Sequence, residues 1–138
     1  MYLENWGRPA RGLRRYVRLV AEELGCSGNA FWVDTEAPVS AYLPLDDRVP
    51  AFPERDLALI WTPTHGWYAA IETASGEELV VVSYAGDEVL PSPAEVAAYV
   101  RALVRGGGPG RPTPPDGPVD ADLPERLAAY NGGVAAPA

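Results

Sequence analysis

Between residues 30 and 84 the chain consists of short runs rich in Val, Ile, Trp and Tyr, separated by short segments that contain Pro, Gly, Asp and Thr. Such runs are typical of strands joined by turns. The connections 34–38, 62–66 and 74–77 are too short to hold a crossover helix, so the strands that they join must be antiparallel. We therefore expect a sheet of four or five strands in meander order. The strands are expected near residues 30–34, 39–45, 57–61, 67–73 and 78–84.

Two amphipathic helices flank the expected sheet. Apolar residues from Leu13 to Leu24 recur at the spacing of one helical face, and Gly25 ends the pattern. The second helix is expected to begin at Ser92, because Ser-Pro-Ala-Glu at 92–95 has the residues of a capping box with proline at the first helical position. It is expected to end before Gly106. The predicted fold class is α+β, an antiparallel sheet flanked by an N-terminal and a C-terminal helix.

The chain of 138 residues has the length of one domain, followed by an appendage. We expect a single α+β domain over residues 1–106, a Gly/Pro-rich linker over 107–121, and a short C-terminal helix with a tail over 122–138. The last helix has about two turns and a narrow apolar stripe, so it is too short to be stable alone. We expect it to dock on its own domain, on a twin subunit or on another protein.

Two of the expected strands, at 57–61 and 79–82, are apolar on both faces, unlike a strand with one hydrated side. The two long helices can cover one face of the sheet. The other face is then expected to be covered by the C-terminal segment, by a long loop or by a second subunit.

The composition argues against several classes of protein. The net charge of −8 disfavours a general binder of nucleic acid, because such a protein needs many basic groups to neutralise phosphates. No run of about 20 apolar residues is present, so we expect a cytoplasmic protein rather than a membrane protein. Cys26 and His65 are the only residues of their kinds, and no cation-binding spacing is present. We therefore expect no cofactor and no metal site.

The candidate binding residues form three groups, and each group also has a structural interpretation. Arg55, Asp56 and His65 could orient a charged ligand, although an ion pair and a solvated turn histidine are the commoner outcomes. Trp61, Trp67 and Tyr68 could line a ligand groove or pack in the core. An arginine-rich helix face could contact an acidic partner or be merely solvated. Its candidate residues are Arg14, Arg15 and Arg18. No catalytic residue is predicted, because no nucleophile lies in a recognisable elbow.

Four segments carry a resemblance to a known family: residues 11–17, 55–61, 65–73 and 89–93. They resemble an actinobacterial domain family of unknown function, which implies a bacterial cytoplasmic protein and carries over no catalytic residue. The order helix, strand meander, helix is also similar, at fold level, to type III secretion chaperone-like domains. Those domains bind proteins and often dimerise.

Three hypotheses about function remain open. The first is a non-catalytic protein-interaction or adaptor module, a homodimer that uses the uncovered face of the sheet and its tethered last helix. The second, less favoured, is a small-ligand-binding or enzymatic domain with an aromatic pocket near the 46–55 loop and the 62–66 turn. The third is a toxin-neutralising or regulatory partner protein that acts through its acidic surface.

Overall fold

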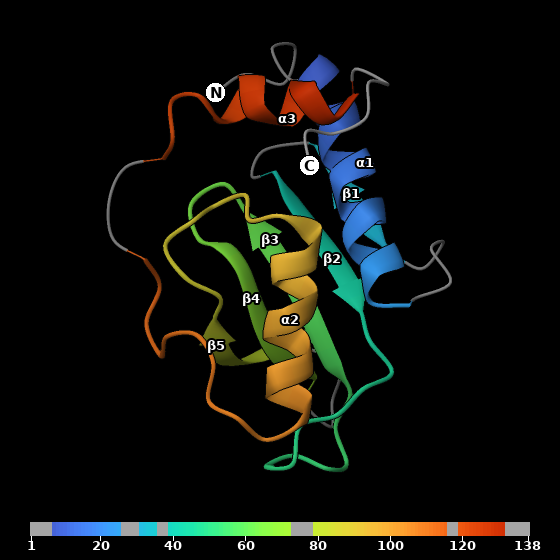
Figure 1. Cartoon of the computed structure of the whole chain (residues 1–138), viewed down its shortest axis with the longest axis vertical. Coiled ribbons are helices and arrows are strands. Elements are labelled where there is room, and N and C mark those ends of the chain that lie inside the picture. The colour runs from blue at the N-terminus through green and yellow to red at the C-terminus, as the bar shows by residue number, and fades with distance from the viewer. Residues whose placement is uncertain (1–6, 26–30, 36–38, 73–78, 116–118, 132–138) are drawn as a thin grey trace.

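The computed structural model describes residues 7–25, 31–35, 39–72, 79–115 and 119–131. Its fold is α+β, as predicted from the sequence: five strands form one antiparallel sheet in the order in which they occur along the chain (Figure 1). The strands are β1 (Trp32–Asp34), β2 (Ser40–Pro44), β3 (Leu57–Thr62), β4 (Gly66–Glu72) and β5 (Leu79–Tyr84). The expected turn at 74–77 lies outside the described residues, as does Cys26.

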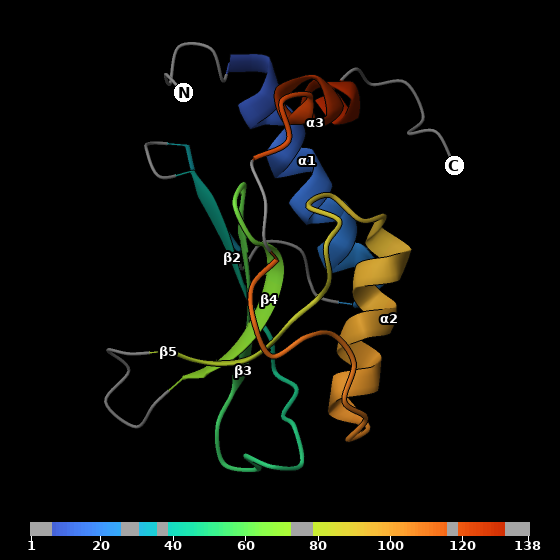
Figure 2. The same ribbon diagram turned by 90° about the vertical axis from the view of Figure 1, so that its left-hand side faces the viewer.

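Helices α1 (Gly7–Glu23) and α2 (Pro93–Val104) lie on the same face of the sheet (Figure 2). α1 turns its predicted apolar stripe toward the sheet, and Leu13, Tyr16 and Val20 are fully buried there. α2 begins with the predicted capping box, in which Ser92 Oγ accepts from the Glu95 N–H at 3.2 Å and Glu95 Oε1 accepts from the Ser92 N–H at 2.9 Å. α2 therefore begins where the local sequence signal places it, whereas α1 begins at Gly7, before the expected apolar stripe from Leu13 to Leu24.

The third helix, α3 (Leu123–Asn131), docks on its own chain, across the N-terminal half of α1 (Figure 1). Leu123 and Leu127 are fully buried in this contact, and the ring of Tyr130 lies 5.0 Å from that of Tyr16. A Cβ on Gly12 of α1 would come within 1.7 Å of the carbonyl oxygen of Leu127. The two helix backbones can approach this closely only because position 12 has no side chain.

The main core lies between the sheet and the helices, and two tryptophans form its centre. Trp61 and Trp67 are fully buried in paired positions of β3 and β4. The Trp61 indole N–H donates to the Val89 carbonyl at 2.7 Å, and the Trp67 indole N–H donates to the Tyr16 hydroxyl at 3.0 Å. The Tyr16 hydroxyl in turn donates to the Pro91 carbonyl. The polar atoms of these aromatic residues are thus satisfied inside the core.

The expected linker is partly held against the sheet. Arg111 and Tyr84 exchange two backbone hydrogen bonds of 2.8 Å, so the segment after α2 pairs at one point with the outer edge of β5. The Arg111 guanidinium also forms an ion pair with Asp87. In the part of the chain that the structure describes, no helix is long and apolar enough to cross a membrane.

Candidate functional site

The face of the sheet that points away from α1 and α2 carries a row of aromatic side chains with Ile60 at its middle position, which we call the aromatic row. Trp32 lies opposite Tyr42, Tyr42 opposite Ile60, Ile60 opposite Tyr68, and Tyr68 opposite Tyr84. Successive residues of a strand point to opposite faces. The residues directly before and after these five along their strands point to the other face, where the core lies between the sheet and the helices. The row therefore crosses all five strands on one face, which we call the open face because, among the described residues, no helix covers it (Figure 2).

The aromatic rings of this row contact one another in two groups. The rings of Trp32 and Tyr42 are 5.8 Å apart, and those of Tyr68 and Tyr84 are 5.3 Å apart. His65, in the β3–β4 turn, joins the second group at 6.1 Å from Tyr68 and 5.7 Å from Tyr84, edge-on to both. These separations are those of favourable aromatic pairs.

The open face explains why β3 is apolar on both sides. Ala58 and Ala70 are fully buried and Ile60 nearly so, and they pack against Tyr42 and Tyr68 of the same face. We expected a further element or subunit to bury these residues. Within the described residues the burial comes instead from the sheet itself, because two tyrosines lie over small side chains.

Other apolar side chains of the same face stay accessible. Trp32 is 63% exposed, Leu79 is 44% exposed and Val81 is 39% exposed. Leu79 and Val81 belong to this face because they pair with Glu72 and Ala70 of β4. These exposed side chains lie at the two edges of the face, with tyrosines between them, and apolar and aromatic side chains on one face are typical of a docking surface.

One carboxylate is built into the open face. The Tyr42 hydroxyl donates to Glu72 Oε2 at 2.7 Å. Partial burial, the hydrogen bond to Glu72 and the negative charge of that carboxylate together raise the pKa of Tyr42 to about 12. The pKa of Tyr68 is also raised, mainly by burial and to a lesser degree by the electrostatic effect of the neighbouring Tyr84. The phenols therefore stay neutral near pH 7, where they offer hydrogen-bond donors and flat apolar surfaces.

The structure separates the tryptophans from Tyr68. Trp61 and Trp67 belong to the helix-side core, whereas Tyr68 and His65 lie on the open face. The 46–55 loop precedes β3 and the 62–66 turn follows it, so they lie at opposite ends of a six-residue strand, about 17 Å apart. The structure therefore does not bring these residues together on one face, because adjacent positions of a strand face opposite ways.

The charged candidates have structural partners or lie elsewhere. Asp56 forms an exposed ion pair with Arg48 at 3.2 Å, and Arg55 is partly buried beside it at the start of β3. The arginines of the α1 candidate group are exposed on the helix surface that faces away from the core. They are Arg14, Arg15 and Arg18. The structure therefore does not bring these residues together with Tyr68 and His65.

Three residues of the open face were missed by reasoning from sequence: Trp32, Tyr42 and Tyr84. The signal that locates them is the strand register, since each lies in line with Ile60 and Tyr68. That register depends on turn geometry and on a bulge between Ala69 and Ala70, which the residue pattern alone did not give.

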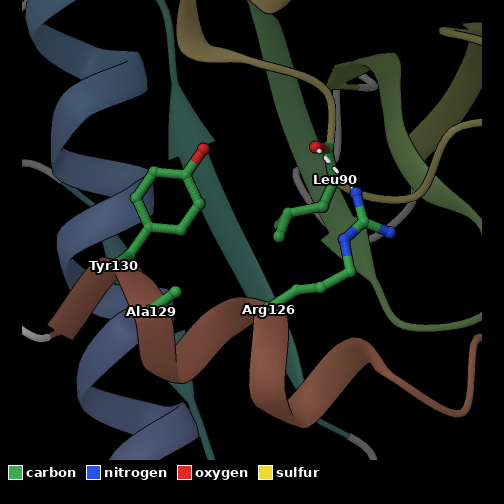
Figure 3. A pocket seen from close by; sticks show the side chains of 4 residues that line it. All are labelled: Leu90, Arg126, Ala129 and Tyr130. Atoms are coloured by element: carbon green, nitrogen blue, oxygen red, sulfur yellow. Dashed lines mark hydrogen bonds between the residues drawn. The ribbon is translucent and has the colours of Figure 1, made fainter. Parts of the chain in front are cut away.

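A second candidate is a hollow of about 210 Å³ between α3 and the segment before α2 (Figure 3). Leu90, Arg126, Ala129 and Tyr130 line it. The Arg126 guanidinium is already engaged, with Nη1 at 2.7 Å from Asp120 Oδ2 and Nη2 at 2.7 Å from Glu88 Oε2. The hollow is smaller than most ligand sites, and its one cation is neutralised by two carboxylates. It is better explained as the edge of the α3 contact than as a binding site.

Metal coordination has no support in the described residues, since none of them form a group of three or more His, Cys, Asp or Glu side chains that could hold an ion.

The sheet and the helices on one of its faces define a small α+β domain, and comparison with known families matches the whole sheet, the C-terminal half of α1 and most of α2. Residues 16–102 match a family of unknown function, DUF6292. The chain belongs to this family. The linker and α3 lie outside the matched residues. No curated protein and no solved structure matches the chain.

Proposed function

We propose that the protein is a non-catalytic protein-interaction or adaptor module of the bacterial cytoplasm, that it works as a homodimer, and that partner proteins dock on its open face. The observation that carries the proposal is the aromatic row across five strands, with Trp32 63% exposed at one end. Trp and Tyr are enriched among the residues that dominate binding energy at protein interfaces. An actinobacterial origin and a likeness to type III secretion chaperone-like domains are part of the same proposal.

The docking of α3 supports this assignment of the binding surface. α3 is one of the elements expected to cover the second face, but it buries Leu123 and Leu127 against α1 instead. Among the residues that the structure describes, no helix then covers the face with the aromatic row, which can receive another molecule. α3 then packs on its own chain and does not serve as a peptide that docks on a partner.

The charge of the face favours a protein over a nucleic acid. Aromatic rows on open sheets can stack with bases, but such sites also need cations for the phosphates. Glu72 is hydrogen-bonded to Tyr42 of the row, and the nearby carboxylate of Asp56 also helps to raise the pKa of Tyr42, in a chain of net charge −8. A partner with apolar and hydrogen-bonding groups fits this surface better than a polyanion.

The test is affinity capture from native cells with three baits: wild type, Trp32→Ser and Phe52→Ser. Phe52 is a matched control, because it is 40% exposed but lies in the loop before β3. Loss of an interface tryptophan costs about 2 kcal/mol or more, roughly a thirtyfold loss in affinity. The proposal predicts that proteins captured by wild type and by Phe52→Ser are lost with Trp32→Ser. Equal capture by all three baits would show that the open face is not the binding surface.

A further inference from the structure

The outer edge of β5 is exposed and apolar over three consecutive residues. Leu79, Val80 and Val81 are 44%, 47% and 39% exposed. In the order of the sheet β5 is an end strand, and among the described residues its outer edge is paired only at Tyr84, with Arg111. The other end strand, β1, has three residues, a length that itself limits edge pairing.

Proteins usually protect an edge strand with charged residues, proline or a bulge. Leu79–Tyr84 contains neither a charge nor a proline. Val82 has no partner in the pairing of β4 with β5, so the bulge lies after the three exposed residues. The contact with Arg111 protects only the end of the strand at Tyr84. The part from Leu79 to Val81 keeps the features of a strand that accepts another strand.

We propose that this edge pairs with the same edge of a second copy, antiparallel and around a two-fold axis near Val80 and Val81. In such a contact the residues near the axis lie opposite the same residues of the second copy, so like charges in the strand would repel each other across the contact. The acidic chain, with net charge −8, has an uncharged strand at this position. A second copy is therefore the occupant that the edge fits best.

The geometry of this pairing connects it with the open face. A two-fold axis between antiparallel edge strands stands perpendicular to the sheet, so the helices of both copies lie on one side. The two open faces then form one continuous surface on the other side. The proposal rests on the proposed homodimer and specifies its contact. Because Arg111 already occupies the edge at Tyr84, only about four residues per copy pair, and the dimer is weak and depends on concentration.

The experiment is sedimentation equilibrium over a wide range of concentrations with wild type, Val80→Lys, Phe52→Lys and Trp32→Ser. Val80 pairs with the core residue Ile71, so a lysine there changes the edge and leaves the open face as it is. Phe52→Lys is the matched control, and circular dichroism checks that every variant is folded. Val80→Thr is a milder second edge variant that keeps the β-branched shape.

The proposal predicts a reversible dimer of the wild type that is at least tenfold weaker in Val80→Lys, weaker in Val80→Thr, and unchanged in Phe52→Lys and Trp32→Ser. A wild type that is monomeric throughout, or a Val80→Lys variant that dimerises like wild type, overturns it. Either result leaves docking on the open face to be decided by the capture experiment with Trp32→Ser. Weakening by Trp32→Ser alone would instead place the contact between copies on the open face and also overturn edge pairing.

Discussion

Gly12 is the position where a single methyl group tests the docking of α3. A Cβ at this position would lie 1.7 Å from the Leu127 carbonyl oxygen and 2.5 Å from its carbon, and both atoms belong to the backbone of α3. Backbone cannot give way by a side-chain rotation, so in Gly12→Ala the whole of α3 must move outward or leave α1. Leu123 and Leu127 would then lose part or all of their burial.

The expected loss of stability follows from these two leucines. Burying a leucine side chain contributes about 1.5–3 kcal/mol, so the two leucines together account for about 3–6 kcal/mol when α3 undocks completely. Alanine in place of glycine inside a helix stabilises the helix by about 1 kcal/mol, which offsets part of this loss. Because α3 can relax partly, we expect Gly12→Ala to lower the free energy of unfolding by about 2–4 kcal/mol.

The assay is urea unfolding, combined with limited proteolysis of the segment that carries α3. Gly7→Ala is the matched control in the same helix, since a Cβ there meets nothing within 4 Å. The control is expected to be neutral or slightly stabilising, with α3 still protected from protease. A Gly12→Ala variant as stable as Gly7→Ala, with α3 protected to the same degree, would refute the close contact between α1 and α3.

Further predictions concern the cap, the acidic network and the open face. Ser92→Ala should lower the free energy of unfolding by about 1 kcal/mol in thermal denaturation, because the capping hydroxyl is lost. Burial alone would raise the pKa of Glu88, but the hydrogen bonds from the Leu90 N–H and Arg126 lower this pKa overall. The ionised Glu88 therefore stabilises the fold above the ordinary pKa of a glutamate, and this stabilisation is lost as the pH falls below about 4. The free energy of unfolding should therefore fall less between pH 5 and pH 3 in Arg126→Gln than in wild type. An equal slope of the free energy of unfolding against pH in the two proteins would contradict this. Glu72→Gln should lower the pKa of Tyr42 from about 12 toward its ordinary value, which an ultraviolet titration against wild type detects, whereas an unchanged titration would show that Glu72 has no influence.

Sequence reasoning located the elements because their signals are local. The runs of β-branched and aromatic residues gave all five strands, and the residues around Ser92 gave the start of α2. It did not give the side of the sheet on which each aromatic residue lies. Leu57–Trp61 is apolar throughout, so the alternation that separates Trp61 from Ile60 leaves no mark in the residue pattern.

The position of α3 depends on a different kind of information. Gly12 inside a helix carries no signal for a neighbour, and the partner helix is more than a hundred residues away in the chain. Only the packed structure shows that the missing side chain makes room for the backbone of Leu127. In the same way, the aromatic row becomes visible only when the four registers between the five strands are aligned.

Hydroxyl-radical footprinting of the complex with a captured partner, compared with the free protein, tests the proposed binding surface most directly. The method reports the solvent exposure of individual aromatic side chains. We predict that oxidation of Trp32, Tyr68 and Tyr84 falls in the complex while that of Phe52 stays the same. Unchanged oxidation of these three residues, with protection appearing on the arginine face of α1 instead, would contradict the assignment of the open face as the interface.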